Sequence, residues 1–151
     1  MVQKWLVAII LILNASTIFP GCSYFAAGSY PFAERYLIDT TEEAIVKAIN
    51  TFKAQHPSFV APKYLEDGRK DSSDHWYHVY FYLPEDSLIL YCWTRPQSET
   101  ETAVALVSIN EGLGSGNWKD INKDFTSAEN KKYLGIFQQR LLKPVMHILE
   151  K

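Results

Sequence analysis

The sequence predicts one α+β domain, and three observations support that prediction. Two segments, near residues 40–57 and 126–144, place apolar residues at helical spacing behind a capping motif. Between them, residues 75–109 are dense in aromatic and β-branched residues and are divided by short polar turns, as in strands. Connections this short favour an antiparallel meander of about four strands, with both helices on one face of the sheet.

The first predicted helix begins at a capping box, in which Thr40 caps the helix and Glu43 reaches back to it. Pro57 ends it. The second begins at a similar box formed by Thr126 and Glu129, and Pro144 is expected to kink or end it. The apolar faces of the two helices contain Ile45, Ala48, Ile49 and Phe52, and then Tyr133, Leu134, Phe137, Leu141 and Leu142.

The strands are predicted from apolar and β-branched runs separated by turn residues. Leu37 and Ile38 are expected to pair briefly, and residues 59–65 to form an edge strand because Pro62 cannot donate a backbone hydrogen bond. The strongest strand covers residues 75–83. Residues 84–87 turn the chain, residues 88–94 return as its hairpin partner, and residues 102–109 form a further strand.

The N-terminus has the composition of an export signal. Lys4 is followed by an apolar run over residues 5–13, which is too short for a helix that spans a bilayer. Gly21 and Cys22 then resemble the lipobox of bacterial lipoproteins, although an apolar N-terminus that stays attached is the alternative. The resemblance implies that residues 1–21 are removed and that Cys22 receives a diacylglyceryl group.

The domain organisation follows from this resemblance. Residues 22–36 would be a lipidated tether, and residues 37–151 a single α+β domain attached to a membrane. The residue after the cysteine is Ser23 rather than Asp. By resemblance to the sorting pattern of bacterial lipoproteins, this implies a location in the outer membrane, facing the periplasm. The formal net charge of −2 argues against a nucleic-acid partner, and 47% hydrophobic residues are enough for a core.

The predicted hairpin has two unlike faces. If Pro84 and Ser87 close the turn, an apolar face suited to a helix-covered core contains Tyr77, Val79, Phe81, Leu83, Leu88, Leu90 and Cys92. The other face joins Ile89 to seven residues that combine aromatic or apolar area with a polar tip. We interpret these seven as partner-binding residues for a protein or a glycan: Trp76, His78, Tyr80, Tyr82, Tyr91, Trp93 and Arg95. The alternatives are that aromatic pairs merely stabilise the sheet, or that other parts of the chain cover this face.

No catalytic or metal-binding pattern emerges, and no cofactor is expected. Cys92 is predicted to face the core, away from His78, and His75 and His78 point to opposite sides of a regular strand. Residues 71–75 contain the residue types of a catalytic triad, but a polar turn explains them. Gly112, Gly114 and Gly116 form a flexible turn, with Trp118 as its anchor. Asp120, Asn122 and Asp124 start like a calcium loop, which Phe125 and Lys131 then break.

The leading functional hypothesis is a non-catalytic, membrane-tethered binding or accessory domain of the bacterial envelope. One alternative is an immunity or inhibitor lipoprotein that neutralises a toxin. The other is a small enzyme with its site near His75 and the loop at residues 112–117.

Overall fold

The computed structural model describes residues 29–114 and 116–151. Residues Phe32–Lys151 form one compact unit, and the described residues 29–31 belong to a separate one. In the compact unit β1 (Glu34–Ile38) leads into α2 (Glu42–Gln55) and a short 3₁₀ helix (Pro57–Phe59). The strands β2 (Tyr77–Leu83), β3 (Leu88–Pro96), β4 (Thr102–Glu111) and β5 (Trp118–Asp120) follow. The chain ends with α3 (Ser127–Phe137), a π-helical segment (Gln138–Leu142) and α4 (Lys143–Leu149).

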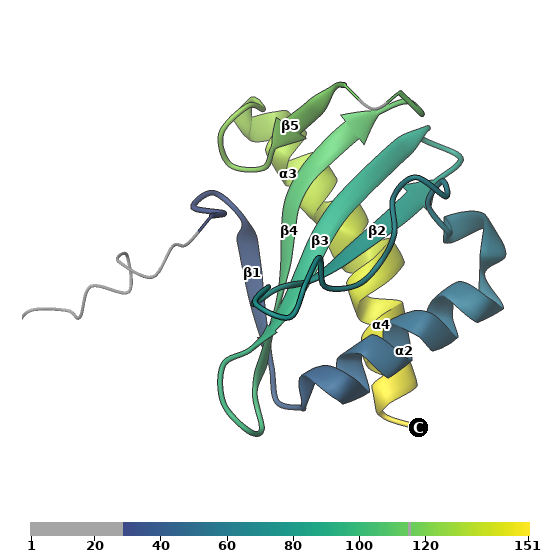
Figure 1. Ribbon diagram of the computed structural model, residues 1–151. Helices are drawn as coiled ribbons and strands as arrows, with labels where there is room; N and C mark the ends of the chain where they lie inside the picture. The colour runs from purple at the N-terminus through teal and green to yellow at the C-terminus, as the bar shows by residue number, and fades with distance from the viewer. Residues whose placement is uncertain (1–28, 115) are drawn as a thin grey trace, which may run out of the picture. The chain divides into compact units, whose positions relative to one another are not determined.

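The predicted α+β class, with an antiparallel sheet and a C-terminal helix, is confirmed. The strands lie in the order β1-β4-β3-β2, and every pair is antiparallel (Figure 1). β2, β3 and β4 form the expected meander, while β1 crosses to the far side of β4. The sequence did not predict β5, which adds three residues to the same edge of β4 beyond β1.

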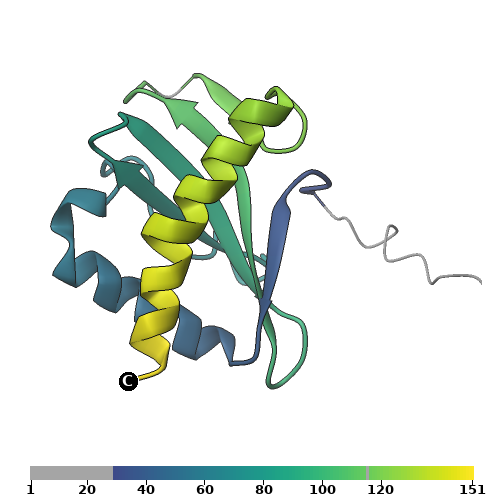
Figure 2. The ribbon, with the colours of Figure 1, turned by 180° about the vertical axis from the view of Figure 1, so that it is seen from behind.

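The hydrophobic core lies between one face of the sheet and both helical segments. The C-terminal helix runs across this face (Figure 2), and α2 packs against α4. Core side chains from the helices and the sheet include Ile45, Ile49, Phe52, Val79, Phe81, Leu83, Leu90, Cys92, Leu106, Phe137, Leu141 and Val145. Among the described residues, every buried member of this core falls between Ile38 and Val145.

Three sequence-based predictions need correction. Residues 59–65 do not form a strand, because Pro57–Phe59 fold into the 3₁₀ helix and only Val60 makes a bridge, to Phe81. The cap of α2 is Thr41, whose backbone is extended and whose hydroxyl accepts a hydrogen bond from the Ala44 N–H at 3.3 Å. The carbonyl of Thr40 instead accepts a hydrogen bond from the Thr102 hydroxyl at 2.8 Å.

The third correction concerns one of the two outcomes expected at Pro144: the C-terminal helix does not end there but continues to Leu149. The widened π turn immediately precedes Pro144, where the ring would otherwise crowd the carbonyl four residues earlier, and the proline lies in the first turn of α4. The second capping box is confirmed, because Thr126 and Glu129 exchange hydrogen bonds between side chain and backbone.

The outer edge of β2 is paired by a loop rather than by another strand. The Asp67 carboxylate accepts a hydrogen bond from the Tyr80 N–H at 2.9 Å, and Gly68 pairs with His78. Lys53, on α2, forms an ion pair with Asp67 and donates to the Tyr80 carbonyl at 2.6 Å. These contacts fasten the segment between the 3₁₀ helix and β2 to the sheet.

The cap assignment can be tested by mutation. We expect Thr41→Ala to lower the free energy of unfolding by about 1 kcal/mol, because the N–H of Ala44 loses its partner. Urea unfolding followed by circular dichroism measures the change. The matched control is Thr40→Ala, which keeps its backbone carbonyl and should cost much less. An equal or larger loss in Thr40→Ala would contradict the assignment.

Candidate functional site

The candidate site is the sheet face opposite the helices, here called the aromatic face. The predicted hairpin register is confirmed, since His78 lies opposite Trp93, Tyr80 opposite Tyr91 and Tyr82 opposite Ile89. The hairpin therefore places on this face Trp76, His78, Tyr80, Tyr82, Ile89, Tyr91, Trp93 and Arg95. Figure 1 looks onto it, with the segment that precedes β2 passing in front of that strand.

The aromatic face has a buried base and a half-buried rim. His78, Ile89 and Trp93 are buried, with Trp93 only 4% exposed. Trp76, Tyr80, Tyr82, Tyr91 and Arg95 remain half-buried. The aromatic face is thus not a fully open platform, because other parts of the chain cover it around His78 and Trp93.

Small side chains continue the aromatic face onto β4. Ala103 lies opposite Arg95, Ala105 opposite Trp93, and Ser108 opposite Tyr91. All three β4 residues are buried. A bulge between Leu106 and Ser108 inserts one extra residue into β4. Ser108 and Ala105 therefore point to the same face, although their numbers differ by three. The large side chains of the hairpin consequently stand beside a row of small ones.

A hydrogen-bonded network supports the base of this face. Asp74 Oδ2 lies 2.8 Å from His78 Nε2, and His78 Nδ1 lies 2.6 Å from the Tyr91 hydroxyl. In the tautomer that carries its proton on Nε2, His78 donates to the ionised Asp74 carboxylate and accepts a hydrogen bond from the Tyr91 hydroxyl at Nδ1. The network fixes the Tyr91 ring at the rim through a buried histidine.

Asp74 is held in its ionised form. Its side chain is 9% exposed, and burial by itself would raise the pKa of its carboxyl group. Hydrogen bonds from the N–H groups of Lys70 and Trp76, both at 3.0 Å, and the contact with His78 outweigh that cost. Together they lower the pKa of Asp74 to about 2.

Sequence reasoning missed this network. It assigned Asp74 to a polar turn and considered His78 beside Cys92, beside His75 and as a partner-binding residue, but never beside Asp74. The signal was present, because an Asp four residues before a strand His can return to it when the intervening chain folds back. Nothing in the sequence fixed that fold-back, which the Gly68–His78 bridge provides.

Aromatic stacking organises the middle of the face. Tyr80 and Tyr91 are stacked with ring centroids 5.0 Å apart, and Tyr91 is also stacked on His78 at 5.6 Å. Trp118, the first residue of β5, contacts the edges of both tyrosines at 6.3 Å. Trp118 belongs to the site, although the sequence suggested only an anchor for the glycine-rich loop.

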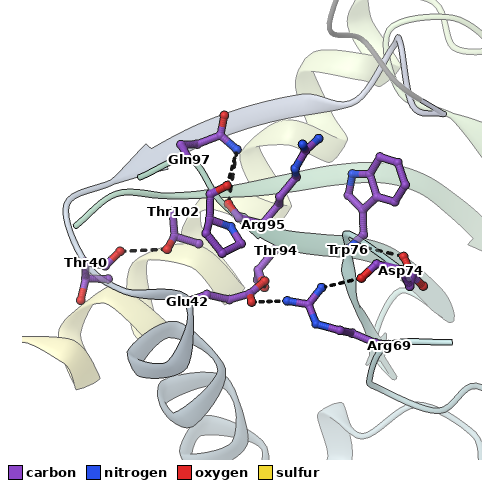
Figure 3. Close-up of polar contacts among 10 residues, drawn as sticks. Thr40, Glu42, Arg69, Asp74, Trp76, Thr94, Arg95, Gln97 and Thr102 are labelled. Carbon is purple, nitrogen blue, oxygen red and sulfur yellow. Dashed lines mark hydrogen bonds and ion pairs between the residues drawn. The ribbon is translucent and has the colours of Figure 1, made fainter. Parts of the chain in front are cut away.

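The other end of the face carries charge. The Arg95 guanidinium lies over the Trp76 ring, with its central carbon 5.7 Å from the ring centroid, and Figure 3 shows the two side chains next to each other. In the same close-up, Glu42 binds Arg69 and accepts a hydrogen bond from the Thr94 hydroxyl at 2.9 Å. Arg69 also donates to the Asp74 carbonyl at 3.0 Å, which ties the helix α2 to the loop that holds Trp76.

The remaining candidates do not assemble into a catalytic site. Cys92 is 2% exposed on the core face, and burial raises the pKa of its thiol far above the usual range, so the thiolate is disfavoured. His75 is exposed and precedes β2. The register places β2's start and the 112–117 loop at opposite ends of the strands, about 20 Å apart. His75 and the described residues of that loop therefore lie far apart.

The acidic sequence near β5 serves local structure. The N–H of Asp120 donates to Asp124, and Asn122 exchanges hydrogen bonds with Asn130. Within residues 29–114 and 116–151, no group of three or more His, Cys, Asp or Glu side chains could hold a metal ion.

No protein-family model matches the chain, and no curated protein shows significant similarity to it. No helix in the described ranges is long and apolar enough to cross a membrane. The predicted signal over residues 1–21 and the lipidation site Cys22 lie outside the described residues.

The Asp74 network predicts a pH-dependent contribution to stability. Because the folded-state pKa of Asp74 lies below its unfolded value of about 4, its contribution is present above that value and is lost as pH falls through about 2. We expect Asp74→Asn to lower the free energy of unfolding at neutral pH, with the difference from the wild type shrinking in acid. Urea titrations over a pH series measure this, with Asp39→Asn, at an exposed position, as the control. A difference independent of pH would contradict the assignment.

Proposed function

We propose that the chain is a lipid-anchored protein of the bacterial envelope, whose domain is a non-catalytic binding or accessory module. Cys22 would carry the anchor, and the domain would face the periplasm from the outer membrane. The aromatic face would contact a protein or glycan partner. The lipobox-like residues Gly21 and Cys22 support the anchor, and the geometry of the sheet supports the binding role.

The observation that carries the binding role is the different composition of the two sheet faces. Both helical segments pack on one face, while the other collects the hairpin's Trp, Tyr, His and Arg side chains. Such residues offer a large apolar area together with a polar tip, and they dominate the binding energy of many interfaces.

The rim also favours binding because its side chains are already ordered. Tyr91 is fixed by a hydrogen bond and ring stacking with His78 and by ring stacking with Tyr80, and Arg95 lies on Trp76. Ordering a free side chain on binding costs about 0.5–1.5 kcal/mol. A partner that contacts these residues would avoid much of that cost.

The anchor is tested by Cys22→Ser. We expect the wild-type chain to incorporate an alkyne-labelled fatty acid and to begin at residue 22, because lipidation adds acyl chains to Cys22 and removal of residues 1–21 makes it the N-terminus. Two or more acyl chains would then give stable membrane attachment. Cys22→Ser should lose the label and keep residues 1–21, as read by intact mass. Cys92→Ser is the control and should retain the label. A wild-type chain that begins at Met1 without label would refute the anchor.

The binding role is tested with Tyr80→Ser/Tyr82→Ser, which alters half-buried rim residues and spares the buried Trp93. The protein is crosslinked in its own cells, and recovered partners are quantified by mass spectrometry. We expect recovery of a stoichiometric partner to fall at least about tenfold, corresponding to the loss of about 1.4 kcal/mol.

The matched control is Val60→Ser, which removes an apolar side chain that is 50% exposed outside the aromatic face. Both variants must show wild-type near-ultraviolet circular dichroism before comparison. Undiminished recovery from a folded double variant would refute the role of the face. Recovery of a secreted toxin as the partner would identify the domain as an immunity or inhibitor protein.

A further inference from the structure

Two arginines lie close together at one end of the aromatic face. Arg95, on β3, lies opposite Ala103 of β4, and Arg35, on β1, lies opposite the neighbouring Ala105. Because paired side chains share a face, both guanidinium groups belong to the same surface. Leu37, which is 59% exposed and lies opposite Ala103 on the other side, completes this arginine rim.

These two arginines differ from the other two in the chain. Arg69 pairs with Glu42, and Arg140 pairs with Glu85 and Asp86. Among residues 29–114 and 116–151, neither Arg35 nor Arg95 forms an ion pair with a carboxylate. Glu99 and Glu101, in the neighbouring loop, form no ion pair with either arginine.

Both side chains are nevertheless held in place. The Arg35 guanidinium donates to Gln97 Oε1 at 3.0 Å, and the Gln97 amide donates to the backbone carbonyl of Pro96 at 3.2 Å. Arg95 rests on Trp76, and its guanidinium points away from Glu42 and Arg69 (Figure 3). Arg35 is exposed and Arg95 half-buried, so both positive charges are ordered and reachable by a partner.

The spacing of the two arginines suits an extended chain. They lie two strands and two residue steps apart, which places their Cα atoms about 12 Å from one another. Carboxylates two to four residues apart on an extended peptide are separated by roughly 7–13 Å. Guanidinium groups bind carboxylates through two parallel hydrogen bonds, which is a geometry that a neutral sugar cannot match.

We propose that the partner is a protein, and that it lays an acidic, extended segment across the arginine rim while its apolar side chains contact the aromatic face. This inference rests on the proposed binding function and specifies the chemistry of the partner. The ordered, unneutralised charges steer association and set its specificity, so binding weakens as salt rises.

The test uses the full chain in detergent and a fluorescein-labelled peptide that carries Glu and Tyr at every second position, with Ser between them, so that both kinds of side chain point to one side of the extended peptide. A peptide with Gln in place of Glu is the uncharged comparison. Fluorescence anisotropy at increasing NaCl measures binding. We expect the Glu peptide to bind more tightly than the Gln peptide, and Arg35→Gln/Arg95→Gln to weaken its binding on the order of tenfold.

The matched control is Lys47→Gln/Lys131→Gln, which removes the same charge from exposed helix positions and should leave the affinity within about twofold. Equal binding of the two peptides, or an equal loss in both double variants, would overturn the proposal. So would a sulfated polysaccharide that binds the rim more tightly than the Glu peptide.

The result can be separated from the test of the aromatic face. If binding of the Glu peptide depends on the two arginines but the cellular partner does not depend on Tyr80 and Tyr82, the arginine-rim proposal is supported and the binding role of the aromatic face is refuted. If the partner requires the tyrosines and the arginine variant binds the Glu peptide normally, the acidic-segment proposal fails alone.

Discussion

Antiparallel pairing of β2 with β3 determines which side chains meet on each face of the sheet. The pairing closes with Leu83 opposite Leu88 and runs without a break to Tyr77 opposite Thr94. A slip of one residue would carry Val79 and Phe81 to the aromatic face and bring Tyr80 and His78 against the helices. Burial of the apolar set therefore fixes the position of every aromatic residue on the opposite side.

The aromatic face is built on a polar base as well as on apolar burial. Asp74 accepts hydrogen bonds from two backbone N–H groups and contacts the His78 ring, and the same ring is hydrogen-bonded to the Tyr91 hydroxyl. Burying a histidine and a carboxylate is favourable only when their hydrogen bonds are satisfied. Satisfying them here makes a loop, a strand and a rim residue depend on one another.

Much of the fold follows from local patterns, and what does not follow depends on long-range contacts. The hairpin faces could be predicted because alternation and a four-residue turn are local, and the Thr126 capping box is equally local. β5 and the crossing of β1 to β4 could not, since short strands gain their stability from neighbours distant in sequence. The cap lies at Thr41, one residue later than predicted, while the carbonyl of Thr40 accepts a hydrogen bond from the distant Thr102. The Asp74 network and Trp118 were missed for the same reason, since a fold-back and a strand addition bring them to the face.

The way in which β2 ends the sheet affects how molecules of this protein meet one another. A bare outer strand is a template for pairing with a second chain. Asp67 occupies the N–H of Tyr80 and Lys53 its carbonyl, so an incoming strand finds these groups already engaged. The opposite border, β1, is only five residues long and includes the charged residues Glu34 and Arg35. Copies crowded at high local density would thus resist edge-to-edge strand pairing at both borders, which leaves the aromatic face as the surface for specific association.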